Sequence, residues 1–184
     1  MNNKNMCSQV NQETTAVENH QQAENYLAQG KLDKAQAACQ KVLATVPDFA
    51  PAYKTLGNIS LDMGQIAEAM DWYTKALATQ PDWAEVYADI GSLYGMQKQW
   101  QSAIDYYQKA IELTPDKWEY YKFLGKCLEK LQKWNRAIAC YSKAIELNPH
   151  HPNNYYLLGK ILEKQKNSSE AIAIYQQGLK TTRK

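Results

Sequence analysis

The sequence lacks any uninterrupted apolar run of about 18 residues, the length that a membrane-spanning helix requires. The segment Met1–Glu18 is rich in Asn, Gln, Thr and Ser and contains no apolar core of a signal peptide. Cys7 is not preceded by the apolar stretch that a bacterial lipid anchor needs. We therefore expect a protein that does not insert into membranes and resides in the cytoplasm.

Cysteine and histidine are too few and too scattered to predict a metal or redox site. No CxxC pair occurs, and no histidine lies at metal-ligand spacing from a cysteine. His150 and His151 are adjacent between two prolines, which is typical of a turn. We expect no metal and no cofactor, and we interpret the thiols as small apolar side chains in a reduced compartment. The four cysteines are Cys7, Cys39, Cys127 and Cys140.

Signatures of catalysis and of nucleic-acid binding are missing as well. The sequence has no Gly-rich phosphate loop and no recognisable Ser-His-Asp or Cys-His set. Pairs of carboxylates such as Glu68 and Asp71 are expected on a solvated helix face. The formal net charge is only +2, so no overall field marks a nucleic-acid binder. We predict that the protein is not an enzyme and has no nucleic-acid partner.

What the sequence does contain is a strict period of 34 residues. The period relates one series of prolines, one of alanines, one of glycines and two of tyrosines. Independent series with a common period indicate a repeat architecture. The series are Pro47, Pro81, Pro115 and Pro149; Ala35, Ala69, Ala103, Ala137 and Ala171; Gly57, Gly91, Gly125 and Gly159; Tyr53, Tyr87, Tyr121 and Tyr155; and Tyr73, Tyr107, Tyr141 and Tyr175.

The spacing within one period predicts a pair of closely packed helices. Ala103, Tyr107 and Ala110 fall on one helical face. A glycine inside a helix costs about 1 kcal/mol relative to alanine, so its recurrence indicates that two helices approach closely. We expect the tyrosines to fill the space beside these contacts and to keep a hydroxyl for solvent or a partner. Each proline should end the second helix. The residues that follow three of these prolines, Asp48, Asp82 and Asp116, are predicted N-caps.

These residues resemble the tetratricopeptide repeat family, whose pattern combines aromatics, Leu-Gly, small alanines and a closing proline. The resemblance implies an all-α fold: a right-handed α-solenoid of about five helix-turn-helix repeats, each with a helix A and a helix B. The third repeat carries the pattern as Tyr87, Ile90-Gly91, Tyr94, Ala103, Tyr107, Ala110 and Pro115.

The period divides the chain into a short leader and five repeats. Asn19 and Gln22 are polar where the pattern expects apolar residues, so the first repeat is interpreted as a degenerate N-terminal cap. The expected segments are a mobile polar segment 1–15, then repeat 1 at 16–49, repeat 2 at 50–83, repeat 3 at 84–117, repeat 4 at 118–151 and repeat 5 at 152–184.

The last repeat is not followed by a further helix that would cover it. Ile172, Tyr175 and Leu179 should therefore leave an apolar stripe partly exposed. Either the chain is part of something longer or a partner covers the stripe, and a homodimer through this uncapped repeat is possible. The alternative function is an N-terminal accessory or oligomerisation domain of a larger bacterial enzyme, such as a glycosyltransferase or methyltransferase.

In the family, helix A residues line a concave groove that binds an extended or helical peptide, so the resemblance implies a protein-interaction scaffold with a protein or peptide partner. The clamp that holds heat-shock chaperone tails is matched only by Lys54 and Asn58, and Asp89 would repel a carboxylate. The asparagine ladder of the array fused to O-linked N-acetylglucosamine transferase is absent. The candidate peptide-binding residues are Lys54, Asn58, Asp89, Lys122, Phe123, Lys126, Tyr156 and Lys160.

Charge is distributed unevenly along the repeats. From Trp118 onward there are 12 Lys and Arg against 5 Asp and Glu, a balance of +7. The preceding residues hold the other 9 basic and 14 acidic residues, a balance of −5, and the sum is the +2 of the whole chain. We therefore expect the acidic part of a ligand to lie toward repeats 4 and 5.

Overall fold

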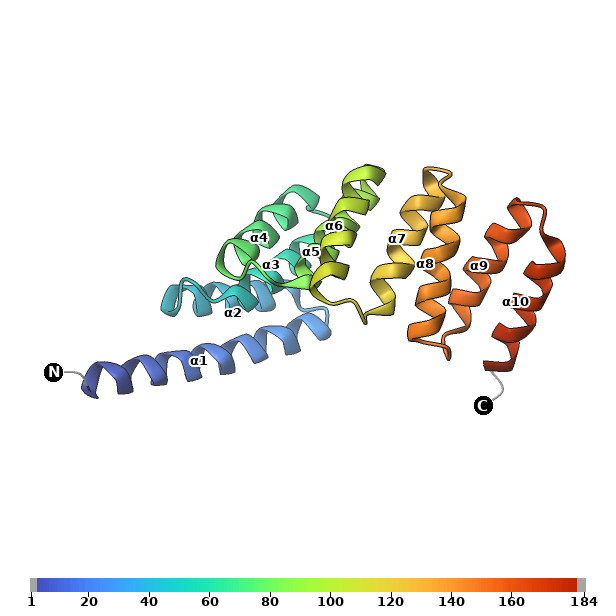
Figure 1. The fold of residues 1–184 in the computed structure, drawn as a ribbon. Coiled ribbons are helices and arrows are strands. Elements are labelled where there is room, and N and C mark those ends of the chain that lie inside the picture. Colours follow the sequence, from blue (N-terminus) through green and yellow to red (C-terminus); the bar gives the residue numbers. More distant parts are fainter. Residues whose placement is uncertain (1–2, 182–184) are drawn as a thin grey trace. The chain divides into compact units, whose positions relative to one another are not determined.

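The computed structural model describes residues 3–181, over which every regular element is an α-helix (Figure 1). The helices form two compact units, residues 1–86 and residues 87–184, which are called the N-terminal and the C-terminal unit below. The bounds are α1 Asn3–Ala28, α2 Leu32–Thr45, α3 Ala50–Asp62, α4 Ile66–Thr79, α5 Ala84–Met96, α6 Trp100–Leu113, α7 Trp118–Lys130, α8 Trp134–Leu147, α9 Pro152–Lys164 and α10 Ser168–Thr181.

The turn between helix A and helix B is the same in all five pairs. Its central residue has a positive φ, for example 77° at Gly64 and 56° at Gln132. The N–H of Gln132 donates to the Glu129 carbonyl at 3.0 Å, and the N–H of Lys133 donates to the Leu128 carbonyl at 2.9 Å. These two bonds define a Schellman motif, which satisfies the last carbonyls of helix A and reverses the chain. The residues with positive φ are Gly30, Gly64, Lys98, Gln132 and Lys166.

Each of the first four helices B, α2, α4, α6 and α8, ends two residues before its proline, as predicted. Helix α8 ends at Leu147, two residues before Pro149. The tyrosine hydroxyls were expected to be kept for solvent or a partner, but several of them donate hydrogen bonds within the chain. Tyr121 Oη donates to the Pro115 carbonyl at 3.0 Å, and Tyr155 Oη donates to the Pro149 carbonyl at 3.1 Å. The hydroxyls therefore fasten helix A to the end of the preceding helix B, because a carbonyl beyond a helix end needs a donor.

The recurring glycines allow tyrosine rings of helix B to lie against helix A. A Cβ added to Gly125 would lie 2.7 Å from Tyr141 Cε1, and one added to Gly91 would lie 3.3 Å from the Tyr107 ring. The predicted close approach is therefore confirmed. Ala103 and Ala137 are 0% exposed, as the repeat pattern requires.

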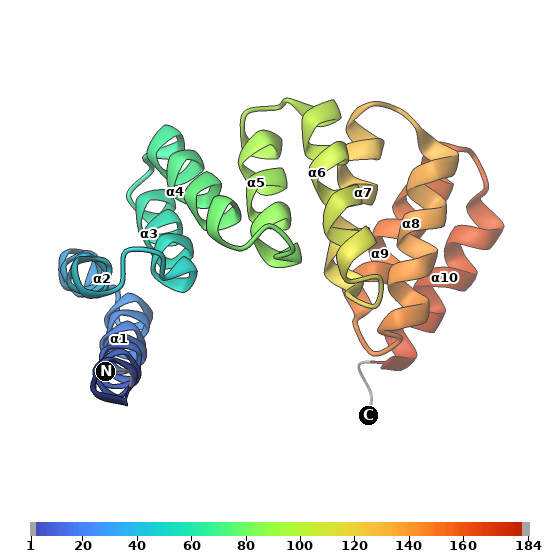
Figure 2. The same cartoon turned by 60° about the vertical axis from the view of Figure 1, so that its left-hand side comes forward.

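Each unit has its own hydrophobic core. In the C-terminal unit, α7, α8, α9 and α10 lie side by side in chain order in Figure 1, and Figure 2 shows the same helices from another direction. Their facing side chains interdigitate. The core of the N-terminal unit includes Ala16, Ala23, Ala35, Cys39, Val42, Ala52, Leu56 and Ile59. That of the C-terminal unit includes Ala103, Ile104, Tyr107, Leu124, Leu128, Ala137, Tyr141, Leu158, Ile161 and Ala171.

Helix α1 begins at Asn3 and continues to Ala28, so it includes most of the segment 1–15, whose mobility stays a prediction. No glycine or proline interrupts the chain before Gly30, so nothing in the sequence stops this helix earlier. Asp48 and Asp116 are not N-caps, because the helices begin one residue later: Phe49 and Lys117 occupy the cap positions without a side-chain hydrogen bond.

Candidate peptide-binding face on helices α7 and α9

The two candidate residues in the N-terminal unit are engaged in internal contacts. Lys54 Nζ lies 2.7 Å from Glu85 Oε2 and 5.3 Å from the centre of the Trp83 ring. Asn58 Oδ1 accepts a hydrogen bond of 2.7 Å from Tyr73 Oη. A ligand would have to displace these partners. The pair that matched the chaperone-tail clamp therefore serves internal packing.

Phe123 is the centre of the candidate site in the C-terminal unit. Its ring stacks on Tyr107 of α6, with centroids 5.8 Å apart and an interplanar angle of 18°. Lys122 Nζ lies 4.4 Å and Lys126 Nζ lies 5.5 Å from the centre of the Phe123 ring. Packing on Tyr107 fixes the ring, and cation–π attraction holds both ammonium groups next to it. Two positive charges consequently gather at one half-buried aromatic surface.

The crowding of these charges is reflected in the pKa of Lys122. Burial lowers this pKa, the nearby Lys126 ammonium lowers it further, and Glu119 opposes the change. Lys122 also contacts the Trp118 ring, with Nζ 4.7 Å from its centre. An anion bound between Lys122 and Lys126 would relieve their mutual repulsion.

Helix α9 presents Tyr156 and Lys160 on one face, a single turn apart. The Tyr156 side chain is 54% exposed although it is large and aromatic. Within the described residues 3–181, neither Lys126 nor Lys160 forms an ion pair with an acidic side chain. Both ammonium groups are therefore available to a partner.

Helix α9 is joined to α7 by a charged contact. Lys164 Nζ lies 2.6 Å from Glu129 Oε1, and Tyr141 Oη donates to Glu129 Oε2 at 3.3 Å. Burial tends to raise the pKa of Glu129, but the hydrogen bond and charge of Lys164, the charge of Lys160 and the hydroxyl of Tyr141 lower it overall. An unpaired Glu129 would weaken the positive field of this face. Because Lys164 neutralises it, Lys122, Lys126 and Lys160 dominate the charge that a ligand meets.

Asp89 lies on α5 at the start of the C-terminal unit and is half buried. Burial is the main cause of the raised pKa of Tyr107, and the negative charge of the Asp89 carboxylate also raises this pKa. Asp89 therefore places a negative charge near the hydroxyl of the tyrosine on which Phe123 stacks. Sequence reasoning grouped it with the lysines, and the structure connects it instead to the packing of α6.

An apolar pocket of about 250 Å³ adjoins Tyr156, and sequence reasoning did not identify it. Its one sequence signal is Gly178, which stands where the repeat pattern has alanine. The Tyr156 and Tyr175 rings lie 6.2 Å apart at its edge. The pocket is lined by Pro152, Tyr155, Tyr156, Tyr175, Gly178 and Leu179.

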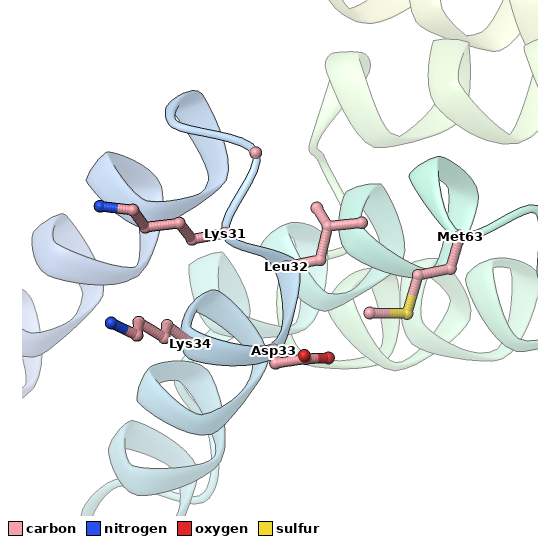
Figure 3. Close-up of a pocket in the computed structure, with 6 residues that line it drawn as sticks. Lys31, Leu32, Asp33, Lys34 and Met63 are labelled. Carbon is pink, nitrogen blue, oxygen red and sulfur yellow. The ribbon is translucent and has the colours of Figure 1, made fainter.

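A larger hollow of about 430 Å³ in the N-terminal unit is a weaker candidate (Figure 3). It lies at the turn before α2, and Figure 3 shows the Lys31 and Lys34 side chains pointing away from Met63. Lys31 Nζ already donates to Gln29 Oε1 at 2.7 Å. The lining therefore offers no group of polar atoms that converges on a ligand.

The side chains that the structure describes, those of residues 13–181, offer no alternative site based on metal or thiol chemistry. No three His, Cys, Asp or Glu side chains gather there to hold a metal ion. Burial raises the pKa of Cys39 to about 12, and that of Cys127 and Cys140 to about 11, so these thiols are poor nucleophiles at neutral pH. None of the described helices is both long and apolar enough to span a bilayer.

Solved structures of similar fold are proteins of the same helical-repeat type. MamA is 27% identical, with a TM-score of 0.79 over 88% of this chain and 94% of that chain. PilF of Pseudomonas aeruginosa is 22% identical, with a TM-score of 0.82 over 91% of this chain and 78% of that one. YrrB, described as a tetratricopeptide protein with an unusual peptide-binding site, is 23% identical, with a TM-score of 0.72 over 90% and 86% of the two chains. A sequence search of curated proteins gave no match.

Two family models match nearly the whole series of repeats. The tetratricopeptide repeat model matches residues 26–90, and the model for subunit 3 of the anaphase-promoting complex, or cyclosome, matches residues 96–178. The first match runs from the end of α1 into α5 and the second from the end of α5 into α10, so together they contain most of the periodic glycines, alanines, tyrosines and prolines. The chain belongs to the tetratricopeptide repeat family and has its all-α solenoid fold.

Proposed function

We propose that this protein-interaction module binds an acidic segment of another protein on the face formed by α7 and α9. This face belongs to the concave groove that the family resemblance implies. The observation that carries the proposal is the set of lysines around Phe123 and Tyr156. Lys126 and Lys160 form no ion pair in the described structure, while Glu129 is neutralised by Lys164. A protein surface that keeps several unpaired cations beside aromatic rings is suited to an anionic partner.

Aromatic side chains on this face add contact area as well as charge. Phe123 is fixed by Tyr107, so it loses little conformational entropy when a ligand covers it. The peptide-binding site reported for YrrB, which has the same fold, supports a peptide as the ligand class. A segment that is extended or helical would satisfy the geometry.

A protein ligand is favoured over nucleic acid by the acidic residues that flank the lysines. Glu119 and Glu163 interrupt the basic surface on α7 and α9, whereas a nucleic-acid groove needs a continuous one. We infer no catalytic role, because the lysines and aromatic rings of this face form no nucleophile–base pair. The cytoplasm remains the location that we propose.

The test compares the proteins captured from extracts of the native cell by wild type and by the double variant Lys126→Glu/Lys160→Glu. Quantitative mass spectrometry should show a loss of about tenfold or more for ligands of this face, because two favourable charge contacts become repulsive. The remaining binding of those proteins should also depend less on salt concentration.

The control is Lys109→Glu, which reverses one charge on helix B of the third repeat, where Lys109 pairs with the exposed Glu112. It should capture the same proteins as wild type. Circular dichroism should show that all variants keep the helical fold. Equal capture by the double variant and by wild type would place the binding surface elsewhere.

A second candidate function is self-association through α10, as a homodimer. Ile172 is 56% exposed and Leu179 is 62% exposed. One repeat earlier, the corresponding residues Ile138 and Ile145 are partly buried against the core. Exposed apolar side chains at positions that are covered in a preceding repeat are characteristic of an interaction surface.

A further inference from the structure

The apolar pocket on α9 and α10 is continuous with the basic face through Tyr156. Tyr156 lines the pocket and shares one side of α9 with Lys160. On the other side of the pocket, Leu179 and Tyr175 supply apolar and aromatic surface. A ligand segment lying on α7 and α9 can therefore reach the pocket without leaving the protein surface.

One repeat earlier, the counterpart of the pocket's edge is in contact with an aromatic ring. Pro152, at the edge of the pocket, stands 34 residues after Trp118. The Trp118 ring lies against the His151 ring, with centroids 4.4 Å apart. The pocket itself is lined mainly by aromatic and apolar side chains, among them Tyr156 and Tyr175. An aromatic side chain of a ligand is therefore suited to this surface.

Charge sets the direction of the ligand. Burial raises the pKa of Tyr175, and the nearby Glu163 carboxylate raises it further, so a negative charge lies beside the pocket. An acidic ligand group is disfavoured there and favoured next to Lys126 and Lys160. The apolar part of the ligand should consequently lie toward α10 and the acidic part toward α7.

We propose that the pocket lined by Tyr155, Tyr156, Tyr175, Gly178 and Leu179 receives an aromatic side chain of the segment whose acidic residues contact Lys126 and Lys160. This inference rests on the proposed function of the α7 and α9 face and specifies its ligand. Packed helices lie about 8–10 Å apart, and an extended chain advances about 3.3 Å per residue. The aromatic residue should therefore stand about two to five positions from the acidic residues.

The probe is a fluorescein-labelled Gly/Ser peptide of about 12 residues that carries one Phe and, about three positions away, two Glu. Fluorescence anisotropy with the full chain should show saturable binding. Replacing Phe by Ser in the peptide should weaken binding about tenfold, because the pocket then stays empty. Replacing both Glu by Gln should weaken binding and remove its salt dependence.

Two variants separate the pocket from the basic face. Tyr156→Ala/Leu179→Ser alters exposed side chains and should abolish the preference for Phe over Ser while keeping the salt dependence. Lys126→Glu/Lys160→Glu should lose binding of both peptides, and Lys109→Glu should behave as wild type. Thermal unfolding followed by circular dichroism should show that each variant is folded.

The possible outcomes distinguish this inference from the proposed function. Equal binding of the Phe and Ser peptides overturns the inference and leaves the basic face as an anionic-ligand site. Absence of binding by every acidic peptide overturns both. Light scattering that shows a dimer dissociated by Leu179→Ser, with no peptide preference in the wild type, assigns the pocket to a second copy and overturns the inference.

Discussion

At the scale of single residues, the contact between glycine in helix A and tyrosine in helix B determines how closely the two helices pack. Gly125 faces the Tyr141 ring, whereas Gly95, also inside a helix, has no atom within 4 Å of the position of an added Cβ. The same substitution should therefore have opposite effects at the two glycines. This pair separates the steric demand of packing from the intrinsic helix propensity of alanine.

We predict that Gly125→Ala destabilises the protein, because the new methyl group would lie 2.7 Å from Tyr141 Cε1. Overpacking of this kind costs about 1–3 kcal/mol, which outweighs the gain of about 1 kcal/mol from helix propensity. Gly95→Ala should stabilise the protein by about 0.5–1 kcal/mol. Urea unfolding measures both changes, and a stabilised Gly125→Ala would mean that Tyr141 moves freely.

The left-handed residue in the A–B turn gives a second prediction at this scale. Gln132 adopts φ 56°, where Gly64 in the N-terminal unit adopts φ 77°. A side chain in this conformation costs roughly 1–2 kcal/mol. Gln132→Gly should therefore raise the free energy of unfolding by about 0.5–1 kcal/mol, less than the full cost because glycine is more flexible in the unfolded chain.

The reverse substitution, Gly64→Gln, is the matched control. It should lower the free energy of unfolding by a similar amount. No atom lies within 4 Å of an added Cβ, so the only cost is that of placing a residue with a side chain at a positive φ. Both values come from chemical unfolding curves. A destabilised Gln132→Gly would indicate that the glutamine side chain makes a contact that offsets its strain.

At the scale of the helices, the charged contact between α7 and α9 should make stability depend on pH. The pKa of Glu129 is lowered in the folded protein, so its ionised form stabilises the fold. This contribution is complete above the usual carboxyl pKa of about 4.5 and is lost as the pH falls through the lower, folded value. Because the Lys164 side chain is 43% exposed, solvent screens the pair, and we expect its contribution to the free energy of unfolding to be only about 0.5–1 kcal/mol.

The measurement is the free energy of unfolding of wild type and Glu129→Gln between acidic and neutral pH. The wild type should be more stable at neutral pH, and the difference should disappear in acid. Glu146→Gln is the control, since its partner Lys143 lies on an exposed helix face. A pH-independent difference would show that Glu129 contributes through packing alone.

The helices themselves could be predicted from the sequence because their ends are encoded locally. Proline stops helix B, and the period places α4 at Ile66–Thr79 and α8 at Trp134–Leu147. The aspartates after the prolines were misassigned because their spacing from the helix start differs by one residue from an N-cap. No local pattern reveals this difference, since propensity does not distinguish a turn aspartate from a cap.

The candidate site was only partly predictable, because its properties depend on contacts between repeats. Phe123 and Lys126 could be placed on one helix face by their spacing. The neutralisation of Glu129 by Lys164 joins residues 35 positions apart and required the structure. The pocket beside Tyr156 was missed for the same reason, since its walls come from two different helices.

At the scale of the whole molecule, the exposed face of α10 determines which assemblies the chain can form. A head-to-tail contact would place α10 against α1 of the next copy. Helix α1 carries the exposed polar residues Gln21, Gln22 and Asn25 where α9 carries the buried residues Leu157, Leu158 and Ile161. Burying these amides without hydrogen-bond partners is unfavourable, so head-to-tail association of copies into filaments is disfavoured. The polar first repeat thus acts against open-ended stacking.

A two-fold contact between α10 helices remains compatible with the surface. Ile172 and Leu179 lie two turns apart. In an antiparallel pair of α10 helices, Ile172 of each copy would therefore contact Leu179 of the other copy. Light scattering at increasing concentration should then show a dimer that Leu179→Glu converts to a monomer. The matched control is Val17→Glu, which changes an equally exposed apolar residue on α1 and should leave the dimer intact. A strictly monomeric wild type at high concentration would exclude self-association and leave the α10 face to a different partner.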